Sequence, residues 1–215
     1  MFASVLEHFG FSQTKPEPHR WVVLDVETTG LDPYHDRLLA IAAIAIQVGP
    51  GFSRPSIQLG DSYEAVLKQE FASDKDNILV HHIGAGAQTR GRPPVEVLEE
   101  FRTWIGTSPL LAFHAPFDEA MMKRAYQQFA LKPLPNDWID IEPLAALSGL
   151  NPKARALDDW LTFFGIECAV RHQAAADTLA TCELLLCLWT SIAREANNLR
   201  ALKKLAQRAA WIPRT

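Results

Sequence analysis

Two acidic residues that follow a short apolar stretch are the most chemically informative feature of this sequence. Asp25 and Glu27 come directly after Trp21-Val22-Val23-Leu24, which has the length and β-branched content of a buried strand. Residues two apart on a strand point to the same face, so both carboxylates leave the strand together. Paired anions in a sheet interior repel each other, and positions 21–36 contain no Lys or Arg to offset them. Because Mg²⁺ is held by one or two carboxylates with water and phosphate, the pair predicts a divalent-cation site.

The residues after this pair extend the signal. The string reads Asp25-Val26-Glu27-Thr28-Thr29-Gly30, and Thr-Thr-Gly is typical of a turn. A bare Asp-x-Glu is about equally compatible with a divalent-cation site and with a strand end whose acids are solvated or cap a turn. The full string of five fixed positions is far more specific than the pair alone.

Three further residues could join such a site. Asp118 follows the apolar stretch Leu110-Leu111-Ala112-Phe113 and falls in the first turn of a predicted helix, where an acid can also serve as a cap. His172 and Asp177 are five residues apart, which on one helix would place them about 140° apart. They converge only if His172 lies in the loop before the helix. The alternatives are an ordinary surface histidine and a first-turn acid favoured by the helix dipole.

Bulk properties limit the protein class. A chain of 215 residues suits one domain, and 48% apolar with 21% charged residues is ordinary for a globular protein. The net charge of −4 argues against wrapping a long nucleic acid but permits gripping a chain end. The three cysteines lack a Cys-x-x-Cys pair, so we expect buried reduced thiols. We expect no secretory signal, no membrane span and a cytoplasmic location.

The order of the predicted elements indicates a mixed sheet covered by helices, because three strands precede an alternation of helix and strand. Residues 1–20 predict a short amphipathic helix and a linker, and residues 21–190 the main domain. Residues 191–215 predict a helical tail that packs on the domain or extends it. We expect strands at 21–24, 38–48, 56–66, 110–113 and 138–141. We expect helices at 95–105, 117–130, 156–164, from 174 past 189, and 195–211.

Taken together, these groups resemble the three motifs of the DEDDh 3′–5′ exonuclease family. That family includes the proofreading subunit of bacterial replicative DNA polymerases and RNase T. The first motif matches Asp-x-Glu-Thr-Thr-Gly, and the third matches His-x-x-x-x-Asp. The second departs from the usual His-Asn-x-x-Phe-Asp, because Phe113-His114 stand where the family has His-Asn, while Phe117-Asp118 are retained. His81 also occupies the His position of a loop similar to the family's His-Gly-Ile-Thr.

The resemblance implies an α/β, ribonuclease H-like fold with a mixed five-stranded sheet, whose first three strands are antiparallel, flanked by helices. It implies two divalent metal ions, Mg²⁺ or Mn²⁺. The implied metal ligands are Asp25, Glu27, Asp118 and Asp177. His172 would be the base that takes the proton from water. The implied substrate-binding residues are Thr28, Thr29, Gly30, Leu31, His81 and Phe117.

The implied activity is release of nucleoside monophosphates from the 3′ end of a single strand, with DNA preferred, as in repair or proofreading. A polymerase or repair protein on a separate chain is a candidate partner, and these residues do not specify an oligomeric state. Trimming of RNA 3′ ends is the nearest alternative. The others are a non-catalytic binding module on the same scaffold and a hydrolase acting on small nucleotides.

Overall fold

The computed structural model describes residues 19–210, and the strand that precedes Asp25 lies in the middle of its sheet. The strands are β1 (Arg20–Thr28), β2 (Leu38–Gly49), β3 (Ser53–Val66), β4 (Leu110–Ala112) and β5 (Trp138–Asp140). The helices are α1 (Lys75–His81), α2 (Ala85–Thr89), α3 (Pro94–Ile105), α4 (Ala115–Gln128), α5 (Ile141–Leu147), α6 (Leu157–Phe164), α7 (Ala174–Glu195) and α8 (Leu199–Ala209), with a 3₁₀ turn, η2, at Pro50–Phe52.

The sheet has the order β3-β2-β1-β4-β5. β1 pairs antiparallel with β2, and β2 with β3, whereas β4 runs parallel to β1 and β5 parallel to β4. The predicted mixed five-stranded sheet, with its first three strands antiparallel, is therefore confirmed. Parallel neighbours place the carboxyl ends of β1, β4 and β5 at one edge, so the residues that follow these strands gather there.

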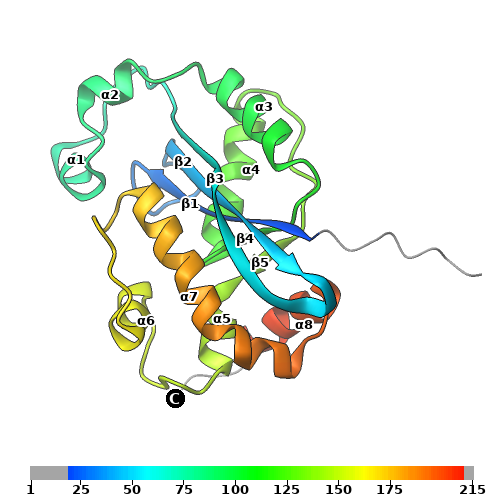
Figure 1. The fold of residues 1–215 in the computed structure, drawn as a ribbon. Coiled ribbons are helices and arrows are strands. Elements are labelled where there is room, and N and C mark those ends of the chain that lie inside the picture. The colour runs from blue at the N-terminus through cyan, green and yellow to red at the C-terminus, as the bar shows by residue number, and fades with distance from the viewer. Residues whose placement is uncertain (1–18, 211–215) are drawn as a thin grey trace, which may run out of the picture.

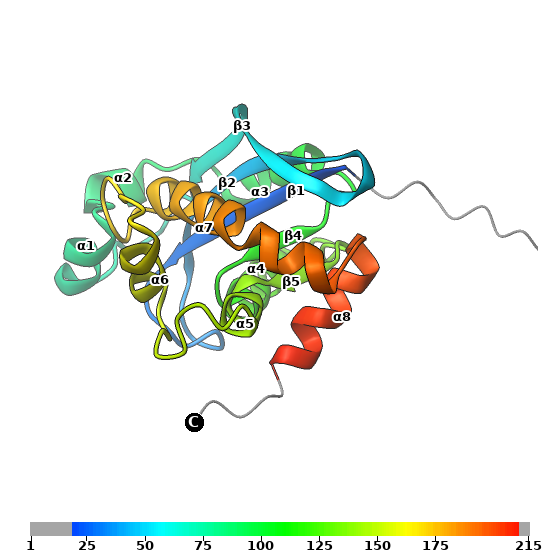
Figure 2. The ribbon, with the colours of Figure 1, turned by 60° about the horizontal axis from the view of Figure 1, so that its bottom comes forward.

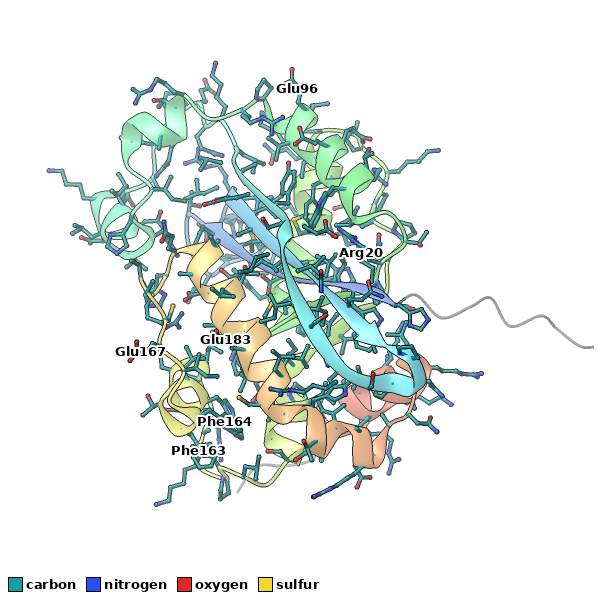
Figure 3. The ribbon with its side chains drawn as sticks, in the orientation of Figure 1. Arg20, Glu96, Phe163, Phe164, Glu167 and Glu183 are labelled. Carbon is teal, nitrogen blue, oxygen red and sulfur yellow. The ribbon has the colours of Figure 1, made fainter. Side chains whose placement is uncertain are left out.

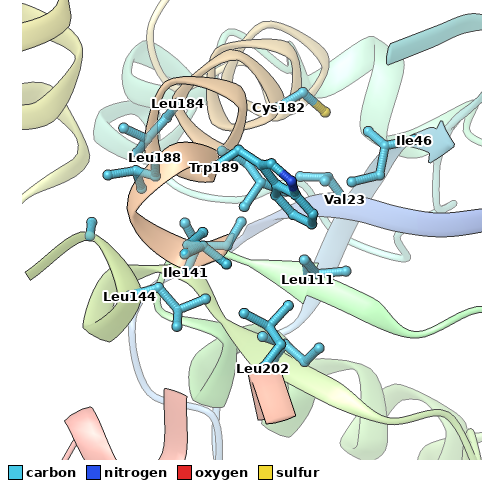
Figure 4. Close-up of a cluster of buried hydrophobic side chains, with 14 of the residues drawn as sticks. Val23, Ile46, Leu111, Ile141, Leu144, Cys182, Leu184, Leu188, Trp189 and Leu202 are labelled. Atoms are coloured by element: carbon cyan, nitrogen blue, oxygen red, sulfur yellow. The ribbon is translucent and has the colours of Figure 1, made fainter. Parts of the chain in front are cut away.

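Alternation along β1 assigns its side chains to two cores. Val22 and Leu24 pack against α3 and α4, whereas Trp21 and Val23 pack against α7 on the opposite face. Figures 1 and 2 show the sheet between these two helical layers. Figure 4 shows the core on the α7 side, where Trp189 lies above Val23. Continuing the alternation, Asp25 and Glu27 belong to the face that α7 covers.

The structure departs from the predicted elements mainly at short segments. The helices α1 and α2 were not predicted, because α1 buries none of its residues and α2 has only five. The helix α5 was also missed, since it begins directly after β5 without a loop. The strand β3 begins earlier than the predicted strand at 56–66, and its pairing with β2 shifts register between Ile44 and Ala45. The predicted N-terminal helix lies outside the described residues.

The C-terminal helices belong to the core. Among the described residues, α7 has the length and composition of a helix that could cross a membrane. It lies across β1 and β2 on the sheet, and this core position also accounts for its apolar composition. Leu202 of α8 is buried in the same core. All three cysteines are free, but only Cys182 is buried; Cys168 is half-buried and Cys187 exposed, so the prediction of buried thiols was wrong for these two.

Candidate active site

Four carboxylates gather around the carboxyl end of β1. The pKa of Asp25 is raised well above its usual value, first by burial and then by the charges of Asp118, Glu27 and Asp177. These groups come from three separate segments of the chain, namely β1, α4 and α7. Because the charges of Asp118, Glu27 and Asp177 all raise the pKa of Asp25, the four carboxylates lie close enough to repel one another at the carboxyl end of β1.

Asp118 reaches the site because β4 runs parallel to β1 and α4 begins immediately beyond it. Asp118 lies in the first turn of α4 and is buried, and its carboxylate accepts the backbone N–H of Val26 in β1. Burial raises the pKa of Asp118 well above its ordinary value, with further contributions from Asp140 and Glu27. A solvent-facing helix cap would show neither the burial nor the contact with β1.

Glu27 lies between two histidines. Its Oε2 contacts His81 Nδ1 at the end of α1, and the charge of His172 also acts on it. Burial nevertheless raises the pKa of Glu27 above its usual value, against the lowering effect of His81. The other oxygen, Oε1, is buried and has no hydrogen-bond partner in the part of the chain that the structure describes. An unsatisfied buried oxygen is what an oxygen-seeking cation would bind.

His172 lies in the loop before α7, which is the position that convergence with Asp177 requires. Its backbone φ of 60° is left-handed, and its N–H donates to Asp177 Oδ2 at 3.0 Å. The imidazole rings of His172 and His81 meet edge to face with centroids 6.5 Å apart. The loop before α7 and helix α1 therefore meet next to Glu27.

Asp177 is also held through its second oxygen. Oδ1 accepts from Arg171 Nη1 and from the thiol of Cys168, whose Sγ lies 3.3 Å away. Burial, followed by this hydrogen bond, raises the pKa of Cys168, so the thiol remains a donor. Asp177 thus meets three donors from the segment between α6 and α7.

The turn after β1 is organised by Asp36. Its carboxylate accepts from the Thr29 hydroxyl and the Asp32 N–H, both at 2.8 Å. A Cβ on Gly30 would lie 2.5 Å from an Asp36 oxygen, so a side chain at this position would displace the Asp36 carboxylate. Leu31 is 86% exposed at the tip of the loop.

Thr28 begins that turn and is less accessible. Its side chain is buried, its hydroxyl donates to the Gly30 carbonyl, and its own carbonyl accepts from Asn77 of α1 at 2.8 Å. A register shift between Glu27 and Thr28 interrupts the pairing with β2 at this point, which increases the local twist. The loop is therefore tied both to itself and to α1.

The unusual Phe113-His114 pair is accommodated by the backbone. His114 adopts a left-handed φ of 65°, and its N–H donates to Asp140 Oδ1 at 3.0 Å. The same oxygen accepts the N–H groups of Ala115 and Glu142. Asp140 thereby holds the start of α4, and with it Asp118, in place.

The donor set suits a hard divalent cation, since it offers carboxylate oxygens, a deficit of positive charge and the unsatisfied Glu27 Oε1. Within residues 19–210, no three His, Cys, Asp or Glu side chains already stand in an arrangement that could hold a metal ion. Asp177 is paired with the Arg171 guanidinium, and Glu27 contacts the His81 imidazole, so both carboxylates are already engaged by neighbouring side chains. The residues fit a metal, and closing around it requires side-chain movement.

The structure brings Asp25, Glu27, Asp118, Asp177 and His172 together, with His81 on one side. The glycine and threonines of the turn adjoin them, and Phe117 packs partly into the core beneath α4. Sequence reasoning gave no role to Asn77, Arg171 or Asp140. Asp140 had a usable signal, because it is an acid at the end of an apolar strand, as Asp25 is.

Known proteins are similar to this chain in sequence and in fold. A model of the RNase T exonuclease family matches residues 22–185. The PolC-type DNA polymerase III of Staphylococcus epidermidis is 26% identical over 193 residues, which is 89% of this chain but 13% of that protein. The Staphylococcus aureus protein is 26% identical over 166 residues, 77% of this chain and 11% of its own. The chain thus spans a small fraction of the polymerases it matches.

Solved structures share the fold. Escherichia coli exonuclease I with a dT13 oligonucleotide has a TM-score of 0.67 at 19% identity, covering 82% of this chain and 42% of that one. A zinc-bound form with single-stranded DNA has a TM-score of 0.67 at 18% identity, with 83% and 43% covered. On the family match over most of its length, together with the fold, the chain belongs to the RNase T-type family of 3′–5′ exonucleases.

Proposed function

We propose that this protein is a metal-dependent exonuclease that releases nucleoside monophosphates from the 3′ end of single-stranded DNA. The observation that carries the proposal is the cluster of Asp25, Glu27, Asp118 and Asp177 beside His172. Acids that repel one another so strongly are retained at a functional site more readily than in a structural core.

Each part of the site has a role in this proposal. The four carboxylates hold two divalent cations, Mg²⁺ or Mn²⁺. When bound, such ions supply charge neutralisation on the phosphate and activation of water. His172 accepts the proton of the attacking water, because an imidazole nitrogen with a free lone pair can act as a general base. His81 orients Glu27, and the Thr28–Leu31 turn and Phe117 bind the terminal nucleotide.

The choice of DNA draws on the relatives. The PolC-type relatives are DNA polymerases, and the exonuclease I structures cited above contain single-stranded DNA or a DNA oligonucleotide. A polymerase or repair protein is accordingly the partner we propose. Trimming of RNA 3′ ends remains the competing function, because the same chemistry serves both sugars.

The decisive experiment compares the purified protein with Asp25→Ala and Asp177→Ala on a 3′-labelled DNA oligonucleotide with Mg²⁺ or Mn²⁺. We expect both variants to lose at least about 10²-fold in rate while keeping their circular dichroism spectra. Retained activity in both folded variants would refute the proposed site.

A matched RNA oligonucleotide in the same assay decides between the two substrates. We expect faster release from DNA, whereas faster release from RNA would reverse the assignment. A wild-type protein that binds the oligonucleotide but cleaves neither substrate would be a binding module.

A further inference from the structure

Arg171 bridges two carboxylates on different helices. Its Nε donates to Asp158 of α6 and its Nη1 to Asp177 of α7. The two partners differ in environment, since the side chain of Asp158 is 60% exposed and that of Asp177 is 8% exposed. Glu167, on the same linker, is exposed and points outward (Figure 3), and the hydrogen bonds that raise the pKa of Arg171 come from Asp158 and Asp177.

The contact occupies a carboxylate that the proposed reaction needs. Both oxygens of Asp177 accept hydrogen bonds, Oδ1 from Arg171 and Cys168 and Oδ2 from the His172 N–H. Burial lowers the pKa of Arg171, but the hydrogen bonds to Asp158 and Asp177 outweigh it and raise the pKa, so the guanidinium stays charged. Asp177 is therefore in contact with a side chain, Arg171, that is always positively charged.

We infer that Arg171 competes with divalent cations for Asp177, and that Asp158 retains the guanidinium when the cation binds. The inference rests on the proposed function and assigns Arg171 as a positioning residue that sets the cation affinity of the site. A guanidinium displaced without a second partner would be left as an unpaired, half-buried charge, which is strongly unfavourable. Asp158 removes that penalty, because it already holds Nε near solvent.

The test is calorimetric titration of the full chain with Mn²⁺, without nucleic acid. Arg171→Met removes the competitor, and Arg171→Lys keeps the charge but not the planar fork that reaches two carboxylates. Asp158→Asn removes the second partner and is made both alone and with Arg171→Met. The matched control is Arg194→Met, which makes the same change in net charge on α7 about 26 Å along the helix from Asp177.

We expect Arg171→Met to tighten Mn²⁺ binding about tenfold, a usual size for coupling between two ligands. Arg171→Lys should tighten it less, and Arg194→Met should leave it within about twofold. Asp158→Asn alone should weaken Mn²⁺ binding several-fold, because Arg171 then has Asp177 as its remaining partner. In the Arg171→Met background the same change should have no effect.

Two results would overturn the inference while leaving the proposed function intact. One is wild-type Mn²⁺ binding that Asp177→Asn abolishes but Arg171→Met does not tighten beyond the Arg194→Met control. The other is an Asp158→Asn effect of equal size in both backgrounds, which would show that Asp158 acts independently of Arg171. A wild-type protein that does not bind Mn²⁺ would overturn the inference and the proposed function together.

Discussion

The acids around Asp25 oppose the folding of the chain that carries them. Burial and mutual repulsion raise the pKa values of Asp25, Glu27 and Asp118, so the folded protein holds protons on these groups more tightly than the unfolded chain. Their contribution to stability is complete below about pH 4 and is lost as the pH rises through the raised values. At neutral pH these carboxylates therefore lower the free energy of unfolding unless a cation offsets them.

The pH dependence gives a prediction for Asp25→Asn. In chelator at pH 7 this variant should melt above the wild type, by about 2–4 °C for each kcal/mol of repulsion removed. Near pH 4 the difference should vanish, because the wild-type carboxyl is then protonated as well. Adding Mg²⁺ should stabilise the wild type more than the variant. Thermal melts of both proteins at the two pH values measure this, and a variant that melts below the wild type at both would contradict it.

His172→Ala separates catalysis from binding at the level of one side chain. The backbone N–H that holds Asp177 remains in the variant, so the carboxylate cluster should persist. We expect kcat to fall by about 10²–10⁴-fold, the usual contribution of a general base, with little change in KM. Steady-state rates on the labelled oligonucleotide test this, and an unchanged kcat would remove His172 as the base.

At the scale of elements, short segments of the chain determine the shape of the site. Asp36 closes the β1–β2 turn through its bond with Thr29. Arg124 of α4 supports the turn, because its guanidinium donates to the Asp36 carbonyl at 2.9 Å. Asn77 links the turn to α1. These contacts join four elements at the carboxyl end of β1. The turn can therefore present the exposed Leu31 to a substrate while remaining ordered.

Gly30→Ala tests whether that order matters for binding. The added Cβ would displace the Asp36 carboxylate and break its bond to Thr29, which should raise the KM for DNA several-fold and lower stability by about 1 kcal/mol. The control is Gly60→Ala in β3, where a Cβ meets no atom within 4 Å. Oligonucleotide titrations compare the two, and equal KM values would show that the turn tolerates the change.

At the scale of the whole molecule, the sheet separates two cores, and α8 completes one of them. This helix contacts α5, β5 and α7, and its Leu202 is fully buried. Its exposed face carries Arg200, Lys204 and Arg208. We propose on this basis that the C-terminal helix is part of the nuclease domain.

Leu202→Ala should therefore destabilise the domain by about 2–5 kcal/mol, the usual range for a buried leucine. Lys204→Ala, two residues along the same helix, should change stability by less than about 0.5 kcal/mol. Chemical denaturation of both variants makes the comparison. A small effect of Leu202→Ala would show that α8 is an appendage.

The sequence by itself determined the fold class and the position of the first two acids of the candidate site. The apolar, β-branched run of residues 21–24 is a local property, so it predicted a buried strand, and the period of two then placed Asp25 and Glu27 on one face. The long helices and strands were likewise predicted, because their apolar periodicity extends over several turns or residue pairs. The motif of the first strand then pointed to the family.

Only the tertiary structure decided which side chains hold those acids. The contacts of Arg171 with Asp158 and Asp177, of His81 with Glu27 and of Asp140 with the start of α4 join residues on separate elements. The sequence pattern did not predict the short helix α1, because this helix buries none of its residues and its role depends on contacts with its neighbours. Apolar periodicity shows which residues of one segment are buried in the core. It does not show which polar groups from other segments contact the end of that segment.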